Sequence, residues 1–265
     1  MATVNEVYGF LDKLAPFDLQ MDFDNAGFLV GRGETQVKRL LVALDITLPV
    51  AEEAAEKGCQ LIVSHHPVIF HPVKALTDQS ATGRVLLALA EGHMAAICAH
   101  TNLDAAEGGV NDQLAKRLGL TDIALLEQDG TDRWGRPYGI GRIGRVHAPG
   151  LSGAEYAAYV KEKLNANSVR FEDAGVPVSR VAVGGGSCGS MLADVAAKGC
   201  DTFVTADVKY DVFLSARDMG INLIDAGHYA TENVVCAPLA EKLARAFPDI
   251  RVELAQQNRE PFGAV

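Results

Sequence analysis

The sequence predicts an α/β protein made of two related α/β lobes in a pseudo-two-fold arrangement, with a cleft between them. Three features of the 265-residue chain support this prediction. Short apolar runs alternate with amphipathic segments, which is typical of a mostly parallel sheet covered by helices. Histidines and carboxylates follow several of the apolar runs. A pattern in the first half of the chain also returns in the second half.

The composition is that of an ordinary globular protein, with 48% hydrophobic and 22% charged residues. No apolar stretch reaches the ~18 residues of a membrane span, and the first residues lack the basic and apolar regions of a signal peptide. We therefore expect a cytoplasmic protein. No Cys-x-x-Cys pair occurs, which favours buried free thiols over a thiolate zinc site. The five cysteines are Cys59, Cys98, Cys188, Cys200 and Cys236.

The chain is acidic, with a formal net charge of −10 and a pI of about 5.2. Binding to a phosphate backbone needs clustered Lys and Arg, and the sequence contains no such run. Nucleic acid is therefore disfavoured as a partner. An anionic small substrate stays compatible with this charge, because bound divalent cations would dominate the field in a pocket.

Apolar spacing in the first half predicts alternating helices and strands. Helices are expected at residues 3–14, from 49 to 58, at 81–91 and at 110–118. Strands are expected at residues 37–46, 60–64 and 94–99.

Residues 121–150 are rich in glycine and proline and break this alternation. We interpret them as a loop followed by a strand at 138–146, at the boundary between two halves. Later helices are expected at 152–165, 189–198, 210–218 and 232–246, and strands at 168–172, 179–183, 202–206, 221–225 and 250–255. The expected lobes are 1–125 and 126–246, with 247–265 packing back on the first and no inserted third domain.

Two segments of the first half recur in the second. Residues 61–67 match 202–208, and residues 97–104 match 225–232, where each contains a histidine followed by an acid four residues later. Ligands lie at the carboxyl ends of strands in open α/β sheets. A duplicated lobe would therefore bring equivalent strand ends to one cleft.

His65 and His66 end an apolar run. Neighbouring side chains of an extended backbone point apart, so one histidine for each metal ion is easier than both on the same ion. By themselves the two rings could equally cap backbone carbonyls at a strand end. The other histidine motifs favour a role as ligands.

Asp104 follows His100 by four residues, and Glu232 follows His228 by four. Imidazole and carboxylate are the ligands of hydrolytic transition-metal sites. Asp104 could instead cap a helix or form an Asx turn, and Glu232 could stabilise the positive end of a helix. The repeat argues against coincidence. His100 is either a ligand or a group that orients one. Three further histidines lack a carboxylate at useful spacing and are interpreted as structural or surface residues: His71, His93 and His147.

Residues 184–189 satisfy the pattern G-x-G-x-x-G between an expected strand and helix, with Asp207 near the end of the next strand. This is the best rival signal, since it matches a dinucleotide-binding fingerprint. The alternative is a tight turn in which glycines permit close packing. Asp207, Lys209 and Tyr210 could contact a substrate near the metals, or Asp207 could cap a helix.

Together these segments resemble the Nif-three-like family, also named GTP cyclohydrolase 1 type 2 homologues. The matching segments keep the family's order over nearly the whole chain: 24–31, 64–67, 100–104, 184–187, 205–210 and 227–232. The resemblance implies two lobes of related topology, a dinuclear metal centre between them and a toroidal homohexamer. Carried over by motif, the metal ligands are His65, His66, Asp104, His228 and Glu232. Ala206 stands where many relatives have glycine, which weakens the role of Asp207.

The expected function is metal-assisted hydrolysis of a nucleotide or other small substrate, with His100 or Asp207 moving protons. GTP ring opening, phosphoester hydrolysis and amide hydrolysis fit the same ligands. Two divalent metal ions are expected for each chain, and nitrogen and oxygen ligands suit zinc, iron, manganese, cobalt or nickel alike. The alternative is a metal-dependent binding or adaptor protein without turnover.

Overall fold

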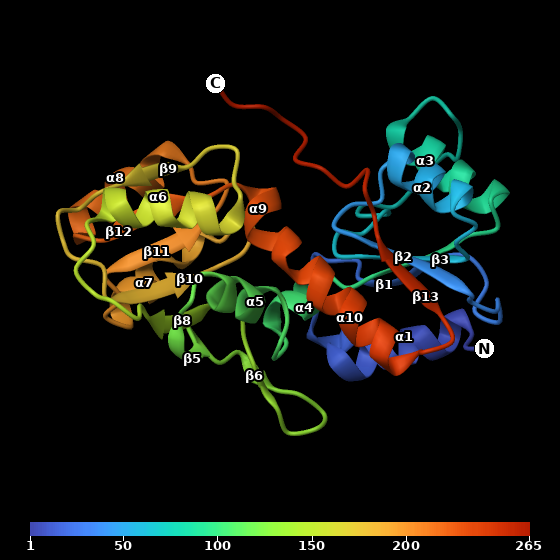
Figure 1. Ribbon diagram of the computed structural model, residues 1–265, viewed down its shortest axis with the longest axis horizontal. Coiled ribbons are helices and arrows are strands. Elements are labelled where there is room, and N and C mark those ends of the chain that lie inside the picture. The colour runs from blue at the N-terminus through green and yellow to red at the C-terminus, as the bar shows by residue number, and fades with distance from the viewer. The chain divides into compact units, whose positions relative to one another are not determined.

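The computed structural model describes residues 1–265 and divides into two compact units (Figure 1). Unit 1 contains Met1–Leu103 and Cys236–Arg259, and unit 2 contains Asp104–Val235 and Glu260–Val265. Each unit combines a sheet with helices, which confirms the predicted α/β class. The predicted lobes, 1–125 and 126–246, follow the sequence repeat, whereas the two units follow the packing. The lobe boundaries therefore stay a prediction.

The sheet of unit 1 has five strands in the order β1-β4-β3-β2-β13. Strands β4, β3, β2 and β13 are mutually parallel, and β1 pairs antiparallel with β4. The strands are β1 (Gly27–Val30), β2 (Arg39–Ala43), β3 (Leu61–Ser64), β4 (Ala95–Cys98) and β13 (Arg251–Leu254).

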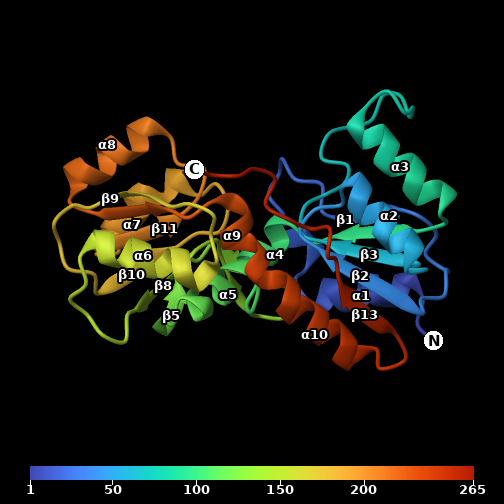
Figure 2. The ribbon, with the colours of Figure 1, turned by 45° about the horizontal axis from the view of Figure 1, so that its top comes forward.

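Helices cover the sheet of unit 1. Helices α2 and α3 lie over one face (Figure 2), where Val50 and Leu89 pack against Leu41 and Ile62 in one buried cluster. Helix α10 contacts β2 and β13. The helices are α1 (Val4–Leu14), α2 (Leu48–Glu56), α3 (Ala81–Glu91) and α10 (Cys236–Ala246). Helix α1 begins with a capping box, in which Thr3 and Glu6 each accept a hydrogen bond from the other's backbone amide.

Unit 2 has a six-stranded sheet in the order β5-β8-β10-β11-β12-β9. Strands β10, β11 and β12 are mutually parallel, and the outer pairings are antiparallel. The strands are β5 (Thr121–Leu125), β8 (Arg142–Arg145), β9 (Arg170–Glu172), β10 (Arg180–Val183), β11 (Thr202–Thr205) and β12 (Asn222–Asp225). A separate two-stranded hairpin joins β6 (Gly130–Thr131) to β7 (Pro137–Tyr138).

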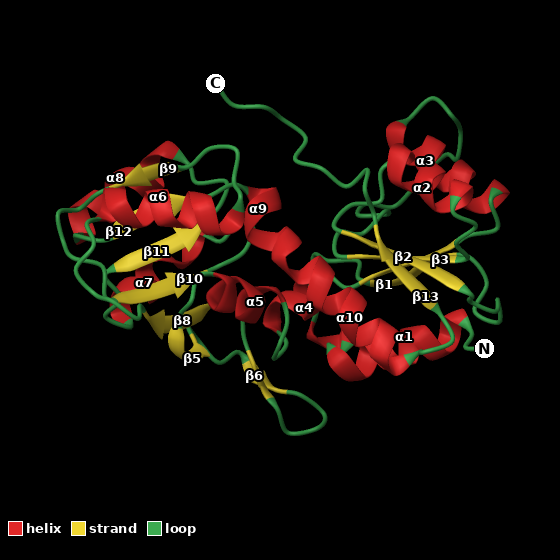
Figure 3. Cartoon of the chain, viewed as in Figure 1, coloured by secondary structure: helices red, strands yellow, loops and turns green.

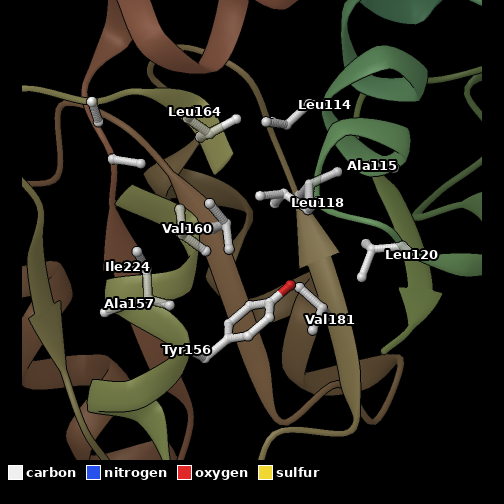
Figure 4. Packing of buried hydrophobic residues seen from close by; sticks show 14 of the residues in the cluster. Leu114, Ala115, Leu118, Leu120, Tyr156, Ala157, Val160, Leu164, Val181 and Ile224 are labelled. Atoms are coloured by element: carbon white, nitrogen blue, oxygen red, sulfur yellow. The ribbon is translucent and has the colours of Figure 1, made fainter. Parts of the chain in front are cut away.

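Both faces of this sheet are buried (Figure 3). Val181 and Val183 point to a cluster with α5 and α6, whereas Ala182 between them points to a cluster with α7 and α8. This alternation follows from the two-residue period of a strand. Figure 4 shows the first cluster around Tyr156. The helices are α5 (Val110–Arg117), α6 (Gly153–Leu164), α7 (Leu192–Ala197) and α8 (Tyr210–Met219).

The predicted internal repeat is confirmed by the topology. The series α1-β1-β2-α2-β3-α3-β4-α4-α5 has the same order of elements as α6-β9-β10-α7-β11-α8-β12-α9-α10. Within the sheets, the strand order β1-β4-β3-β2 corresponds to β9-β12-β11-β10, with an antiparallel strand at the outer edge of each. The last helices are exchanged, because α5 belongs to unit 2 and α10 to unit 1.

Several details differ from the sequence prediction. Strands β1 and β5 were not expected. The expected strand at 138–146 is interrupted between β7 and β8, where Gly141 has a φ of +80°. The expected helix at 232–246 is divided into α9 (His228–Glu232), a 3-10 turn (Asn233–Val235) and α10. All five cysteines are free thiols. None of the helices is both long and apolar enough to cross a membrane.

Candidate metal centre

In unit 1, polar side chains follow three adjacent parallel strands. Asp45 comes after β2, His65 and His66 follow β3 directly, and His100 follows β4. Because carboxyl ends of neighbouring parallel strands share one edge of a sheet, the register brings these four residues together.

His65, His66 and His100 form a compact cluster of imidazole rings. The ring centroids are 5.0 Å apart for His65 and His66, 5.2 Å for His65 and His100, and 5.4 Å for His66 and His100. One nitrogen from each ring lies within 4.8 Å of the others, so the three could hold a metal ion. His100, for which the sequence left two roles open, thus belongs to the same group as the two predicted ligands.

Each ring of this cluster is held through Nδ1. Nδ1 of His65 lies 2.8 Å from the carbonyl oxygen of Ala99, that of His66 2.8 Å from Oδ1 of Asp45, and that of His100 2.7 Å from Oδ1 of Asp24. All three partners are acceptors, so each Nδ1 carries the proton and Nε2 is the nitrogen with a lone pair. Metal-binding histidines are typically held this way, with the second nitrogen donating to an oxygen.

Asp24 is a fully buried carboxylate beside His100. Burial disfavours its charge, but hydrogen bonds from His100 and Thr101 outweigh this and lower the pKa of Asp24 to about 2. Asp24 therefore stays ionised and fixes both the tautomer and the orientation of His100. Sequence reasoning assigned no role to Asp24 or Asp45. Both residues could have been identified as candidates from the sequence, since Asp24 is the first residue of one of the family-like segments and Asp45 follows an apolar run.

In unit 2, His228 and Glu232 occupy the first and last positions of α9. This spacing of four residues places them on one face of the helix, with Nε2 of His228 2.9 Å from Oε2 of Glu232. Nδ1 of His228 lies 2.6 Å from Oδ2 of Asp207, which follows β11. His228 therefore resembles His66 and His100 of unit 1, whose Nδ1 atoms also face a carboxylate.

Asp104 is buried in the short helix α4 (Thr101–Ala105) and begins unit 2. Its carbonyl oxygen accepts a hydrogen bond of 3.0 Å from Nδ2 of Asn111. Burial, together with the charges of Asp104 and Glu232, raises the pKa of the Cys188 thiol to about 12. A concentration of negative charge around Asp104 and Glu232 is the condition that a divalent cation would relieve.

The glycine loop after β10 supports these acidic groups. The amide of Gly185 donates to Oδ1 of Asn111 at 2.8 Å, and that of Gly186 donates to Oγ1 of Thr231 at 3.0 Å. These amides are thus used within unit 2, whereas a dinucleotide site would direct them at a pyrophosphate. The loop fits the alternative interpretation of a tight turn that permits close packing.

The chain as a whole matches the family Duf34/NIF3 (NGG1p interacting factor 3) over residues 2–261. The protein belongs to the Duf34/NIF3 family. This confirms the family expected from the sequence motifs.

Similar proteins cover almost the whole chain. A Streptomyces coelicolor protein named GTP cyclohydrolase 1 type 2 homolog is 35% identical over 272 residues, which is 100% of this chain and 95% of that protein. A Helicobacter pylori protein named GTP cyclohydrolase 1 type 2 is 33% identical over 246 residues, 92% of each chain. The crystal structure of a Staphylococcus aureus hypothetical protein has a TM-score of 0.93 and 32% identity, and covers 99% of each chain.

In this Duf34/NIF3 protein, the predicted ligands form two groups. His65 and His66 lie in unit 1 beside His100, whereas Asp104, His228 and Glu232 lie in unit 2. The donor set fits a divalent transition metal, because four histidines present Nε2 and are fixed at Nδ1, and two acids are buried. The histidines interpreted as surface residues are exposed: His71, His93 and His147.

Proposed function

We propose that this protein binds two divalent metal ions and uses them to hydrolyse a nucleotide or another small substrate. The proposed ligands are His65, His66, Asp104, His228 and Glu232. The observation that supports the proposal most strongly is shared by the four histidines at strand ends. Each has Nδ1 within hydrogen-bond distance of a carbonyl or carboxylate oxygen, so Nε2 is the nitrogen directed away from that partner, and Nε2 of His228 lies beside the second proposed ligand of its helix, Glu232.

Divalent metal ions held by such ligands supply Lewis acidity and lower the pKa of water toward ~7. The residues of the chain have separate tasks. Asp45 and Asp207 orient His66 and His228, so they position ligands. His100, backed by the ionised Asp24, is either a third imidazole ligand or the group that moves a proton during hydrolysis. Asp207 is the second candidate for proton transfer, since its carboxylate is half exposed.

The substrate class rests on the similar proteins. The Helicobacter pylori relative is named for GTP cyclohydrolase activity, and GTP ring opening begins with attack of water on an imidazole carbon. Phosphoester and amide hydrolysis need the same metal-assisted attack of water and are equally compatible with these side chains. The substrate is therefore proposed as a small molecule with a hydrolysable bond, with nucleotides first among the candidates.

The second candidate function is metal-dependent binding of a partner without turnover. It is favoured by the description of the family, which names an interacting factor. An enzyme should lose turnover and keep its fold when a ligand is removed. An adaptor should show no turnover with any substrate but should capture its partner only when metal is present.

The test measures metal content and hydrolysis together. Elemental analysis of protein purified without chelator should find up to two equivalents of divalent metal, and the double variant His65→Ala/His66→Ala should lose most of it. The matched control is His71→Ala/His93→Ala, which removes two exposed imidazoles and should change nothing. Metal-loaded protein is then assayed against nucleotides, phosphoesters and small amides. Equal metal content in both double variants would disprove the metal assignment.

A further inference from the structure

Unit 1 contains a cavity of about 310 Å³ that borders the candidate metal centre. It lies where the segments after β2 and β3 meet the first turns of α2 and α3, and all of its lining residues belong to unit 1. Ligands of open α/β sheets bind outside the carboxyl ends of the strands, which is the position of this cavity. Its volume is at the lower end of the ~300–1,000 Å³ that is usual for small-molecule sites.

Two of the lining residues belong to the proposed metal chemistry. His66 is a proposed ligand, and Asp45 holds its Nδ1 at 2.8 Å. The side chain of His66 is 22% exposed and that of Asp45 is 43% exposed, so a molecule in the cavity can reach both. Such a molecule would therefore lie beside an imidazole that is proposed to bind a metal ion.

The apolar part of the lining is fixed by the core of unit 1. Ile46 and Val85 are buried in the cluster beneath α2 and α3, and Leu48 and Val68 pack against the same cluster while remaining partly exposed. Side chains held in this way present a preformed apolar surface. A flat ring can lie on such a surface without needing a hydrogen bond from it.

Arg84 is the one arginine or lysine of the lining. It lies in the first turn of α3, its side chain is exposed, and it forms no ion pair with any acid of the chain. Nη1 donates to the carbonyl oxygen of Asp78 at 3.0 Å, which leaves the other N–H groups of the guanidinium for a ligand. The planar guanidinium matches two oxygens of a phosphate, so Arg84 is suited to bind an anionic group.

We propose that this cavity binds the substrate of the metal centre, and that this substrate carries a phosphate group that Arg84 binds. A ring of the substrate lies on Leu48 and Val68, and its hydrolysable bond faces His66. This inference rests on the proposed function, because His66 makes the cavity a substrate site only if it holds a metal ion. Among the candidate substrates it favours nucleotides and other phosphate-bearing molecules over small uncharged amides, which would leave Arg84 without a partner.

The experiment uses the full-length protein as purified, with phenyl phosphate and benzyl alcohol as probes that share a ring but differ in charge. Dissociation constants are measured by ligand-observed NMR titration. Phenyl phosphate should bind saturably at millimolar concentration. Arg84→Gln should weaken its binding about tenfold, which corresponds to one hydrogen bond to a charged group, and should leave the affinity for benzyl alcohol unchanged. Arg84→Lys should recover part of the loss, because it keeps the charge without the planar fork.

Two further variants separate the cavity from general effects of charge. Arg32→Gln removes the same charge from an exposed position of unit 1 outside the cavity, and should leave the affinity for phenyl phosphate unchanged. Thr82 is exposed and lines the cavity, so Thr82→Trp should fill the space with an indole and abolish binding. Equal losses in Arg84→Gln and Arg32→Gln, absence of saturable binding in the wild type, or binding that survives Thr82→Trp would overturn the proposal.

Metal content is measured on the same samples, so that this inference and the proposed function can fail separately. Arg84→Gln should contain as much metal as the wild type. Metal-loaded protein whose affinity for phenyl phosphate is unaffected by Arg84→Gln would contradict this inference alone. Wild-type protein without metal would contradict the proposed function, whichever probe it binds.

Discussion

Gly186 lies directly against Glu232 within unit 2. A Cβ atom on residue 186 would stand 2.1 Å from Oε1 of Glu232 and 3.2 Å from Nε2 of His228. The residue also has a φ of +65°, a conformation that favours glycine. The glycine loop is thus shaped by the side chains that it touches, and a glycine at position 186 is needed to leave them in place.

The first prediction follows from this contact. Gly186→Ala should displace Glu232 and His228, and lower metal content measured by elemental analysis. It should also destabilise unit 2 by about 1–2 kcal/mol through the backbone conformation alone. Gly199→Ala is the matched control, because Gly199 has a φ of +67° and open space around its Cβ position. The control should lose stability and keep its metal. If both variants keep their metal, the contact with Glu232 has no bearing on the site.

The second prediction concerns the carboxylate behind His228. Asp207→Asn keeps the shape of the side chain but removes the charge that faces Nδ1 of His228. Metal affinity should fall on the order of 10-fold, as is usual when the group that orients a ligand is altered. Glu232→Gln should cost at least as much, since it changes a proposed ligand. Competition with a metal-binding dye measures both, and the exposed Asp218→Asn provides a control with the same loss of charge. Identical affinity in Asp207→Asn and Asp218→Asn would remove the role proposed for Asp207.

A third prediction concerns Arg142, which forms a network of buried hydrogen bonds in unit 2. The guanidinium of Arg142 is almost fully buried and donates to the carbonyl oxygens of Gly139 and Gly141, and to Oδ2 of Asp112 at 2.8 Å. Arg142→Met would leave these acceptors and a buried charge unpaired. We expect a loss of about 3–5 kcal/mol in the free energy of unfolding by urea.

The exposed Arg145→Met on the same strand is the control for this variant, and it should change stability little. A comparable loss in both variants would mean that the buried network contributes nothing specific.

The fourth prediction is a dependence of stability on pH. Glu53 is buried, which disfavours its charge, but hydrogen bonds from the amides of Gln256 and Gln257 and from Lys57 lower its pKa below the usual 4.5. A carboxyl group whose pKa is lower in the folded state stabilises the protein above its unfolded pKa. Its contribution is lost as the pH falls from about 4.5 through the lower folded pKa. Glu53→Gln should reduce the loss of unfolding free energy between pH 4.5 and lower pH, measured by urea titrations at several pH values. The same pH dependence in the variant and the wild type would show that Glu53 does not contribute to acid destabilisation.

The fifth prediction is the assembly state, which rests on the family resemblance. Light scattering should give about six times the 28.2 kDa mass of one chain. A stable monomer at micromolar concentration would contradict the proposed homohexamer.

The sequence predicted most elements because local rules decide them. The helix at 81–91 has the bounds of α3, and the apolar runs at 60–64 and 202–206 contain β3 and β11. All four edge strands are only partly buried, and of these β9 and β13 were predicted whereas β1 and β5 were missed. Edge strands need no continuous apolar run, so periodicity carries little signal for them.

In the candidate site, too, some features could be predicted from the sequence and others could not. Histidines and acids after apolar runs could be recognised from their type and spacing alone, and so could the repeat that relates His100 to His228. Asp24 could not be placed beside His100, since 76 residues separate them and their hydrogen bond depends on where β1 and β4 meet. The contact of Gly186 with Glu232 could not be predicted either, because it forms only when the loop after β10 meets helix α9 in the folded unit.

The sequence by itself thus determined the α/β class, the family, the duplicated order of elements and the residues able to bind a metal. These depend on side-chain chemistry and on periodicities of a few residues. Only the tertiary structure decided which partner holds each imidazole, which glycine amides are occupied, and that α5 and α10 are exchanged between the units. Those outcomes depend on contacts between segments far apart in the chain. The sequence of an amphipathic helix shows which face is apolar, but not which sheet that face will contact.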